Sequence, residues 1–129
     1  LDTNATNLPQ IKKLIDLNLL DYIAIDFKAP SYKFKKIVGV DMYDNTIKTI
    51  QYLIRIDFSF ELRTTINKSL LDENDINEMI KTISKLGYKK TYYLQNFLET
   101  SSNIGNISKS SDIDKNKIDC QNLTIQYRN

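Results

Sequence analysis

Apolar side chains recur along this chain in patterns that separate helices from strands. Between Glu73 and Leu86 they return every three or four residues and form one continuous stripe, which predicts an amphipathic helix. Asp72 precedes the stripe as a capping residue, and Gly87 follows it at a position that favours the end of a helix. This segment is the clearest helix in the sequence.

Weaker versions of the same spacing predict helices over Leu8–Leu20 and Tyr43–Ile56, with a shorter one near Tyr32–Ile37. Short runs rich in β-branched and aromatic residues predict strands between these helices. The predicted strands are Asp21–Phe27, Phe58–Ile66, Thr91–Phe97 and, at an edge of the sheet, Leu123–Tyr127. Leu1–Thr3 falls where a strand before the first helix should end.

Strands and helices therefore alternate at the spacing of βαβ units, which predicts an α/β class with a parallel sheet in a single domain over residues 1–129. The segment Thr100–Asn122 is rich in Ser, Asn, Asp and Lys, and we expect it to form a flexible loop. Because the chain begins at Leu1 and not at methionine, we expect a fragment that lacks the N-terminal strands of its sheet.

Composition narrows the chemistry that the chain can carry. With 129 residues, 41% of them apolar and 26% charged, it is typical of one soluble globular domain. It has no histidine and a single cysteine, Cys120, which excludes a disulfide framework, a Cys/His zinc site and a histidine base within this chain. The 18 basic and 16 acidic residues are interspersed, so nothing favours nucleic-acid binding. Without a membrane-length apolar run or a signal-peptide pattern, we expect a cytoplasmic protein.

Candidate functional residues stand at the carboxyl ends of the predicted strands, where parallel α/β folds bind ligands. Asp2, Thr3 and Asn4 occupy the first strand-to-helix turn, where they either bind a ligand or simply cap the helix. Asp26 and Lys28 close the next strand and project from one face, because residues two apart in a strand share a face. Together they either hold a zwitterionic or anionic ligand or form a plain salt bridge.

Arg63 lies near the end of the following strand, within an otherwise apolar segment. A guanidinium there needs a partner, because burying it unpaired is costly. The partner is a ligand, Glu61 on the same face, or Asp26 across the sheet. Gln95 and Asn96 end the next strand, where they either orient a ligand or merely terminate the strand.

Several of these short motifs occur in an order that resembles one enzyme family. They are Leu1-Asp2-Thr3-Asn4, the run from Asp21 to Pro30 that contains Asp26-Phe27-Lys28, Val38-Gly39-Val40, Phe60-Glu61-Leu62-Arg63-Thr64-Thr65, Leu71-Asp72-Glu73 and Tyr93-Leu94-Gln95-Asn96-Phe97. The chain resembles the radical S-adenosylmethionine (SAM) activating enzymes. Within them it is similar to the C-terminal part of the anaerobic ribonucleoside-triphosphate reductase activating proteins, which are related to pyruvate formate-lyase activating enzymes.

The resemblance implies an incomplete TIM-like (β/α)6 barrel and a SAM-dependent oxidoreductase. Such an enzyme holds a 4Fe–4S cluster on a Cys-x-x-x-Cys-x-x-Cys loop, which would lie upstream of Leu1, so this chain alone is expected to be inactive. It uses a 5′-deoxyadenosyl radical to generate a glycyl radical on its partner. The implied partners are a glycyl radical enzyme, here anaerobic ribonucleotide reductase, and an electron donor of the flavodoxin or ferredoxin type.

The resemblance also assigns expected roles to individual residues. Asp2, Thr3 and Asp26 would hold a monovalent cation beside SAM. SAM itself would contact Asn4, Asp26, Lys28 and Arg63.

Two residues depart from the pattern of the family. Ala5 stands where the family's turn has glycine, and alanine is disfavoured at positive φ. Phe97 stands where the formate-lyase relatives carry a histidine, which favours the ribonucleotide reductase branch.

Two other readings of the sequence stay open. In one, the chain is a non-catalytic α/β half-barrel that binds a small anion or docks to a partner subunit. In the other, it is a structural domain that dimerises through the exposed edge of its sheet.

Overall fold

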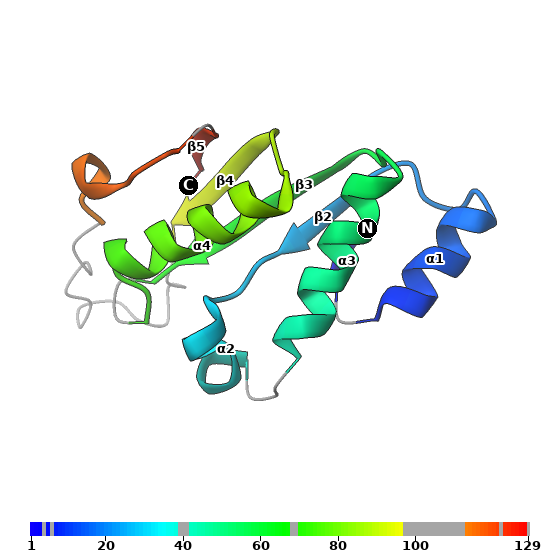
Figure 1. The fold of residues 1–129 in the computed structure, drawn as a ribbon, viewed down its shortest axis with the longest axis horizontal. Coiled ribbons are helices and arrows are strands. Elements are labelled where there is room, and N and C mark those ends of the chain that lie inside the picture. The colour runs from blue at the N-terminus through cyan, green and yellow to red at the C-terminus, as the bar shows by residue number, and fades with distance from the viewer. Residues whose placement is uncertain are drawn as a thin grey trace, which may run out of the picture.

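One parallel sheet of five strands organises the protein, which we describe from a computed structural model covering residues 1–3, 5, 7–38, 42–67, 70–96, 113–121 and 123–128 (Figure 1). The strands follow one another across the sheet in chain order: β1 (Asp2–Thr3), β2 (Ile23–Asp26), β3 (Phe60–Ile66), β4 (Thr91–Asn96) and β5 (Thr124–Arg128). The predicted α/β class with a parallel sheet is confirmed, and β5 lies at an edge as expected.

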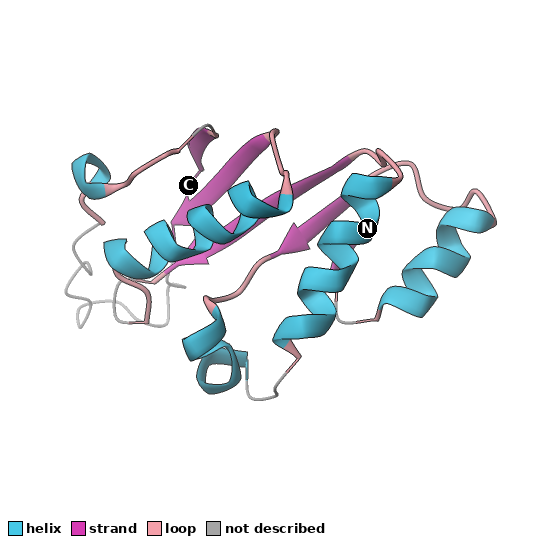
Figure 2. Ribbon diagram, viewed as in Figure 1, coloured by secondary structure: helices cyan, strands magenta, loops and turns pink. Residues whose placement is uncertain are grey.

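Helices connect the successive strands (Figure 2). They are α1 (Leu8–Asp16), α2 (Ser31–Val38), α3 (Tyr43–Arg55) and α4 (Glu73–Leu86), and the 3-10 turn η2 (Lys115–Lys117) precedes β5. Parallel strands joined in chain order by right-handed crossovers carry their helices on one face of the sheet. Accordingly, Figure 1 shows α3 and α4 on the same side of the strands.

The hydrophobic core fills the space between the sheet and these helices. Ile25, Leu62 and Tyr92 are in register on adjacent strands, and their side chains are fully buried. They belong to the same buried cluster as the apolar stripe of α4, which contributes Ile76, Met79, Ile80 and Ile83. We call this side of the sheet the helix-covered face.

Local sequence sets the ends of α4 as predicted. The side chains of Asp72 and Asp75 each accept a hydrogen bond from the other residue's backbone N–H, which forms a capping box at the helix start. Gly87 ends the helix in the left-handed conformation, with φ of 97°. Helix α1 is shorter than predicted, because Asn18 adopts a φ of 56° and the helix ends at Asp16.

Several residues named in the sequence analysis lie outside the described residues. They are Asn4, Gly39 and Val40 of the Val38-Gly39-Val40 motif, Phe97 at the end of a predicted strand, and most of the Thr100–Asn122 segment. Within that segment, the structure describes residues 113–121, which hold η2.

The opposite side of the sheet is polar, and we call it the open face. Its side chains alternate with the core residues along each strand, and apart from the buried Ala24 they are half-buried or exposed. They include Asp26, Glu61, Arg63, Thr65, Tyr93, Gln95, Gln126 and Arg128.

Candidate functional site

Strand register brings Asp26 and Arg63 together on the open face. The two residues are paired directly across β2 and β3, and Arg63 Nε donates to Asp26 Oδ1 at 2.7 Å. Arg63 Nη2 also lies 3.2 Å from Asp2 Oδ2, at the end of β1. One guanidinium therefore pairs with carboxylates of the two preceding strands, β2 and β1. Of the partners that the sequence left open for Arg63, the structure shows Asp26. Glu61 forms hydrogen bonds with other residues.

Lys28 completes this cluster just beyond the end of β2. Its Nζ donates to Asp26 Oδ2 at 3.3 Å, so Asp26 binds a different cation with each of its oxygens. The Lys28 side chain is 41% exposed, whereas those of Arg63 and Asp26 are 22% and 25% exposed. The ammonium is thus the most accessible positive charge of the cluster, and we call Asp2, Asp26, Lys28 and Arg63 the charged cluster.

The hydrogen bond with Asp26 raises the pKa of Arg63 above its ordinary value. Burial acts in the opposite direction and lowers this pKa, but its effect is smaller. Its guanidinium therefore stays cationic at every pH at which the protein is folded. The charged cluster contains two carboxylates and two cationic side chains, so its formal charges cancel. A zwitterionic group, which is also neutral overall, can therefore bind there without adding a net charge to the site.

The described residues of the turn after β1 do not join the charged cluster through their side chains. The Thr3 hydroxyl accepts a hydrogen bond from the Ala5 N–H at 3.0 Å, which makes Thr3 part of the turn itself. Ala5 is fully buried and has a φ of 61°, the left-handed conformation that favours glycine. Asn4 lies outside the described residues, so its predicted role stays a prediction.

The predicted cation site coincides with the guanidinium of Arg63. Asp2 and Asp26, two of its three expected ligands, both pair with Arg63, which supplies the positive charge between them. Among the residues that the structure describes, no three acidic, cysteine or histidine side chains converge as a metal site would require. The monovalent cation therefore stays a prediction from the family resemblance.

A second polar group on the open face was missed by the sequence analysis. Glu61 accepts hydrogen bonds from the Tyr22 hydroxyl and from Arg128 Nη1, both at 3.0 Å. The Arg128 guanidinium lies 3.6 Å from the centre of the Tyr93 ring, in a cation–π contact. Burial and the bond to Glu61 raise the pKa of Tyr22 to about 12, so its hydroxyl remains a donor.

A signal for this second group was present in the alternation of β3. Glu61 and Arg63 flank the buried Leu62, so their charged side chains share one face of β3. Charged residues on one face of a strand predict oppositely charged or polar partners on the adjacent strands. Gln95 also lies on the open face, in register with Thr65 and Arg128. It therefore points toward the same side of the sheet as the charged cluster.

The comparisons with known proteins found one informative similarity. The chain is 34% identical over 88 residues to a curated protein of Methanocaldococcus jannaschii that is provisionally named a glycyl-radical enzyme activating enzyme. The match covers 64% of this chain and 37% of that protein, so the chain spans little more than a third of its length. No protein-family model and no solved structure matches the chain significantly.

The helices described in the structure include none that combines the length and apolar character of a membrane span.

Proposed function

We propose that this chain is part of a radical SAM activase that generates a glycyl radical on a partner enzyme. The observation that carries the proposal is the charged cluster, in which Asp26, Lys28 and Arg63 converge at the carboxyl edge of a parallel sheet. The similarity to a protein with an activating-enzyme name supports the same conclusion.

The charged cluster fits the methionine end of SAM, which carries an ammonium and a carboxylate. In the proposal, the exposed ammonium of Lys28 pairs with the carboxylate of the ligand. Asp26 accepts the ammonium of the ligand, and Arg63 holds Asp26 in place through the 2.7 Å bond. When bound beside a reduced 4Fe–4S cluster, SAM would supply the radical that removes a hydrogen atom from glycine.

A 4Fe–4S cluster does not fit within these residues. The chain has one cysteine, Cys120, and it is exposed, whereas such a cluster needs several thiolates. In the proposal, the thiolates that hold the 4Fe–4S cluster belong to a part of the enzyme outside these 129 residues.

Several finer features belong to the same proposal. The sheet would form part of an incomplete β/α barrel, with the open face lining its interior. The enzyme would be a cytoplasmic oxidoreductase that takes electrons from a flavodoxin or ferredoxin. Its partner would be anaerobic ribonucleotide reductase, and the 129 residues alone would be inactive.

Substitution of Lys28 tests the proposal in the complete protein reconstituted with iron and sulfide. Lys28→Ala removes a charge-assisted contact worth about 1.5–3 kcal/mol, so SAM should bind about ten to a hundred times more weakly by calorimetry. Lys35→Ala provides the matched control, because Lys35 is an exposed lysine of the nearby helix α2.

Reductive cleavage of SAM to methionine and 5′-deoxyadenosine would distinguish the enzyme from a non-catalytic half-barrel. A complete protein that neither binds nor cleaves SAM contradicts the proposed function. Equal affinities of Lys28→Ala and Lys35→Ala for SAM contradict only the assignment of Lys28.

A further inference from the structure

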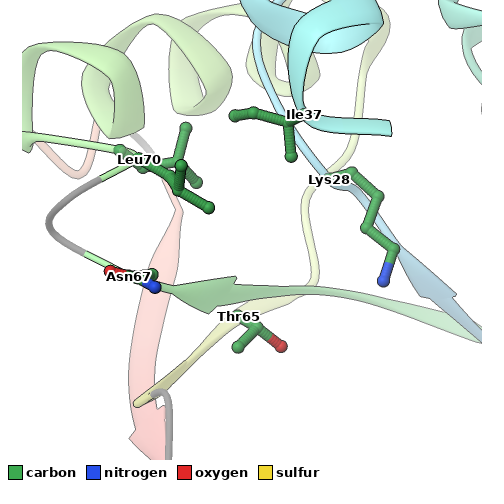
Figure 3. Close-up of a pocket in the computed structure, with 6 residues that line it drawn as sticks. Lys28, Ile37, Thr65, Asn67 and Leu70 are labelled. Atoms are coloured by element: carbon green, nitrogen blue, oxygen red, sulfur yellow. The ribbon is translucent and has the colours of Figure 1, made fainter. Parts of the chain in front are cut away.

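A small apolar cavity adjoins the charged cluster at the carboxyl edge of the sheet. It has a volume of about 160 Å³ and is lined by Lys28, Ile37, Thr65, Asn67, Leu70 and Leu71. Figure 3 shows Leu70 and Lys28 on opposite sides of the cavity, with Ile37 of α2 between them. Lys28 therefore belongs to both features, because its stem lines the cavity and its ammonium bonds Asp26.

The size of the cavity decides what it can hold. An apolar cavity of about 150 Å³ accommodates a molecule the size of benzene. Pockets for cofactors and drug-sized ligands are larger, about 300–1,000 Å³. The cavity is therefore too small for a nucleoside but matches one aliphatic or aromatic side chain. Among the lining residues that the structure describes, most are aliphatic and Lys28 is the one titratable group.

The two main walls are tied together before any ligand arrives. Lys33 of α2 donates from Nζ to the Leu70 carbonyl at 3.1 Å and to Asp75 Oδ2 at 2.5 Å. The Tyr32 hydroxyl donates to the other oxygen of Asp75 at 2.7 Å. Helix α2 is thus fastened to the start of α4 and to the backbone of Leu70. A preformed pocket loses little free energy to ordering when it binds.

A glycine substrate explains why such a pocket is needed. Glycine has no side chain, so an enzyme that selects one glycine of a polypeptide must recognise its backbone and the neighbouring side chains. Apolar burial supplies about 1.5–3 kcal/mol for one full-sized aliphatic or aromatic side chain, which is enough for about tenfold discrimination or more.

We propose that this cavity binds one apolar side chain that flanks the target glycine in the polypeptide substrate. The inference rests on the proposed function and adds to it the chemistry by which the substrate is selected. The substrate segment carries an aliphatic or aromatic residue close to its glycine. That residue occupies the space between Ile37 and Leu70, and this places the glycine beside the charged cluster.

Short glycine-centred peptides provide the probe, in a set that differs only in one flanking residue: leucine, phenylalanine, alanine or lysine. Affinities are measured by calorimetry on the complete, reconstituted protein in the presence of SAM. The wild-type protein should bind the leucine or phenylalanine peptide about tenfold more tightly than the alanine peptide. Equal affinity for all the peptides, or no affinity for any, overturns the proposal.

Two variants locate the preference. Leu70→Lys introduces a charge at a side chain that is 46% exposed, so the fold should tolerate it, and the apolar preference should disappear. Ile37→Ala enlarges the cavity and should shift the preference from leucine toward phenylalanine. A Leu70→Lys protein that keeps the wild-type preference overturns the proposal.

A matched control and a separate readout keep this test distinct from that of the proposed function. Leu19→Lys places the same charge on a leucine that is 64% exposed. Leu19 precedes β2, near the amino end of that strand, whereas the cavity lies at the carboxyl ends. The Leu19→Lys protein should therefore bind the peptides as the wild type does. SAM cleavage without peptide tests the proposed function independently. A protein that cleaves SAM but does not discriminate among the peptides refutes the pocket alone, whereas a protein that does not cleave SAM refutes both.

Discussion

The two faces of the sheet are built from the same strands but from opposite kinds of side chain. On the helix-covered face, Leu62 and Tyr92 are fully buried in a continuous apolar core. On the open face, Arg63 and Tyr93, their neighbours in sequence, are only half-buried and take part in ion-pair and cation–π contacts. One face therefore stabilises the fold by removing apolar surface from water, and the other keeps charges available to a ligand.

Two Lys–Asp pairs show the same contrast in detail. Lys33–Asp75 joins α2 to α4, and the Asp75 side chain is only 5% exposed. Lys28–Asp26 lies on the open face, with side chains that are 41% and 25% exposed. A pair screened by water contributes little to stability, whereas removing one partner of a buried pair leaves a desolvated charge. The first pair is therefore structural, and the second is free to exchange its partner.

The largest expected effect comes from shortening a side chain on the helix-covered face. Leu62→Ala should lower the free energy of unfolding by about 2–5 kcal/mol, because it creates a cavity in a packed core. Gln95→Ala, on the open face of the adjacent strand, should change it by less than about 0.5 kcal/mol. Urea denaturation measures the free energy of unfolding of both variants. Equal losses of stability would contradict the conclusion that the helix-covered face stabilises the fold more than the open face.

The next largest difference in stability is expected between substitutions of Asp75 and Asp26, the acids of the two Lys–Asp pairs. Asp75→Asn weakens the hydrogen bonds from Lys33 and Tyr32 in a buried setting and should cost about 1–3 kcal/mol. Asp26→Asn, on the open face, should cost no more than about 1 kcal/mol while still weakening SAM binding in the complete protein. A larger loss of stability in Asp26→Asn would show that the charged cluster is mainly structural.

The pH dependence of stability should follow Asp75. Burial alone would raise the pKa of Asp75, but hydrogen bonds from Lys33 and Tyr32 outweigh it and leave the pKa lowered. The folded pKa is thus below the unfolded value of about 3.9, so Asp75 contributes stability above that pH. The contribution is lost as pH falls through the folded pKa. Denaturation of Asp75→Asn between neutral and acidic pH should therefore show a weaker pH dependence than the wild type.

The smallest effect is expected at the turn after β1. Ala5→Gly relieves a left-handed backbone cost of about 1–2 kcal/mol. It also loses a buried methyl group worth about 0.8 kcal/mol and gains about 0.5–1 kcal/mol of entropic cost. These terms nearly cancel, so the net change should lie within about 0.8 kcal/mol of zero. Ala29→Gly, equally buried and without a positive φ, should destabilise by about 1 kcal/mol or more.

Local sequence was sufficient for most of the fold. Helix α4 was predicted to the residue because its stripe, capping box and terminal glycine all act within the helix. The end of α1 was misplaced by four residues, because no glycine or proline marks the point where Asn18 adopts positive φ. A left-handed asparagine depends on the path of the following chain, which the apolar spacing does not reveal.

The candidate site was predictable in its residues, whereas its pairings could be given only as alternatives, among them the Asp26–Lys28 and Arg63–Asp26 pairs that the structure shows. Asp26 and Lys28 close one predicted strand and Arg63 was expected near the end of the next, which pointed to them because parallel strands present their carboxyl ends at one edge. In the structure Arg63 is the central residue of β3, and it meets Asp26 because β2 ends beside it. The link between Glu61 and Arg128 was not foreseen, since 67 residues separate them and only the register of β3, β4 and β5 brings them close. The cavity beside Lys28 likewise joins α2 to the segment after β3.

By itself, the sequence determined the order of strands and helices, their caps and the polar alternation of β3, because each of these depends on neighbours along the chain. Tertiary structure decided which carboxylate Arg63 binds, how Lys33 fastens α2 beside Leu70, and which side of the sheet stays open. These features depend on strand register and on crossover direction, which bring together residues that the chain keeps far apart.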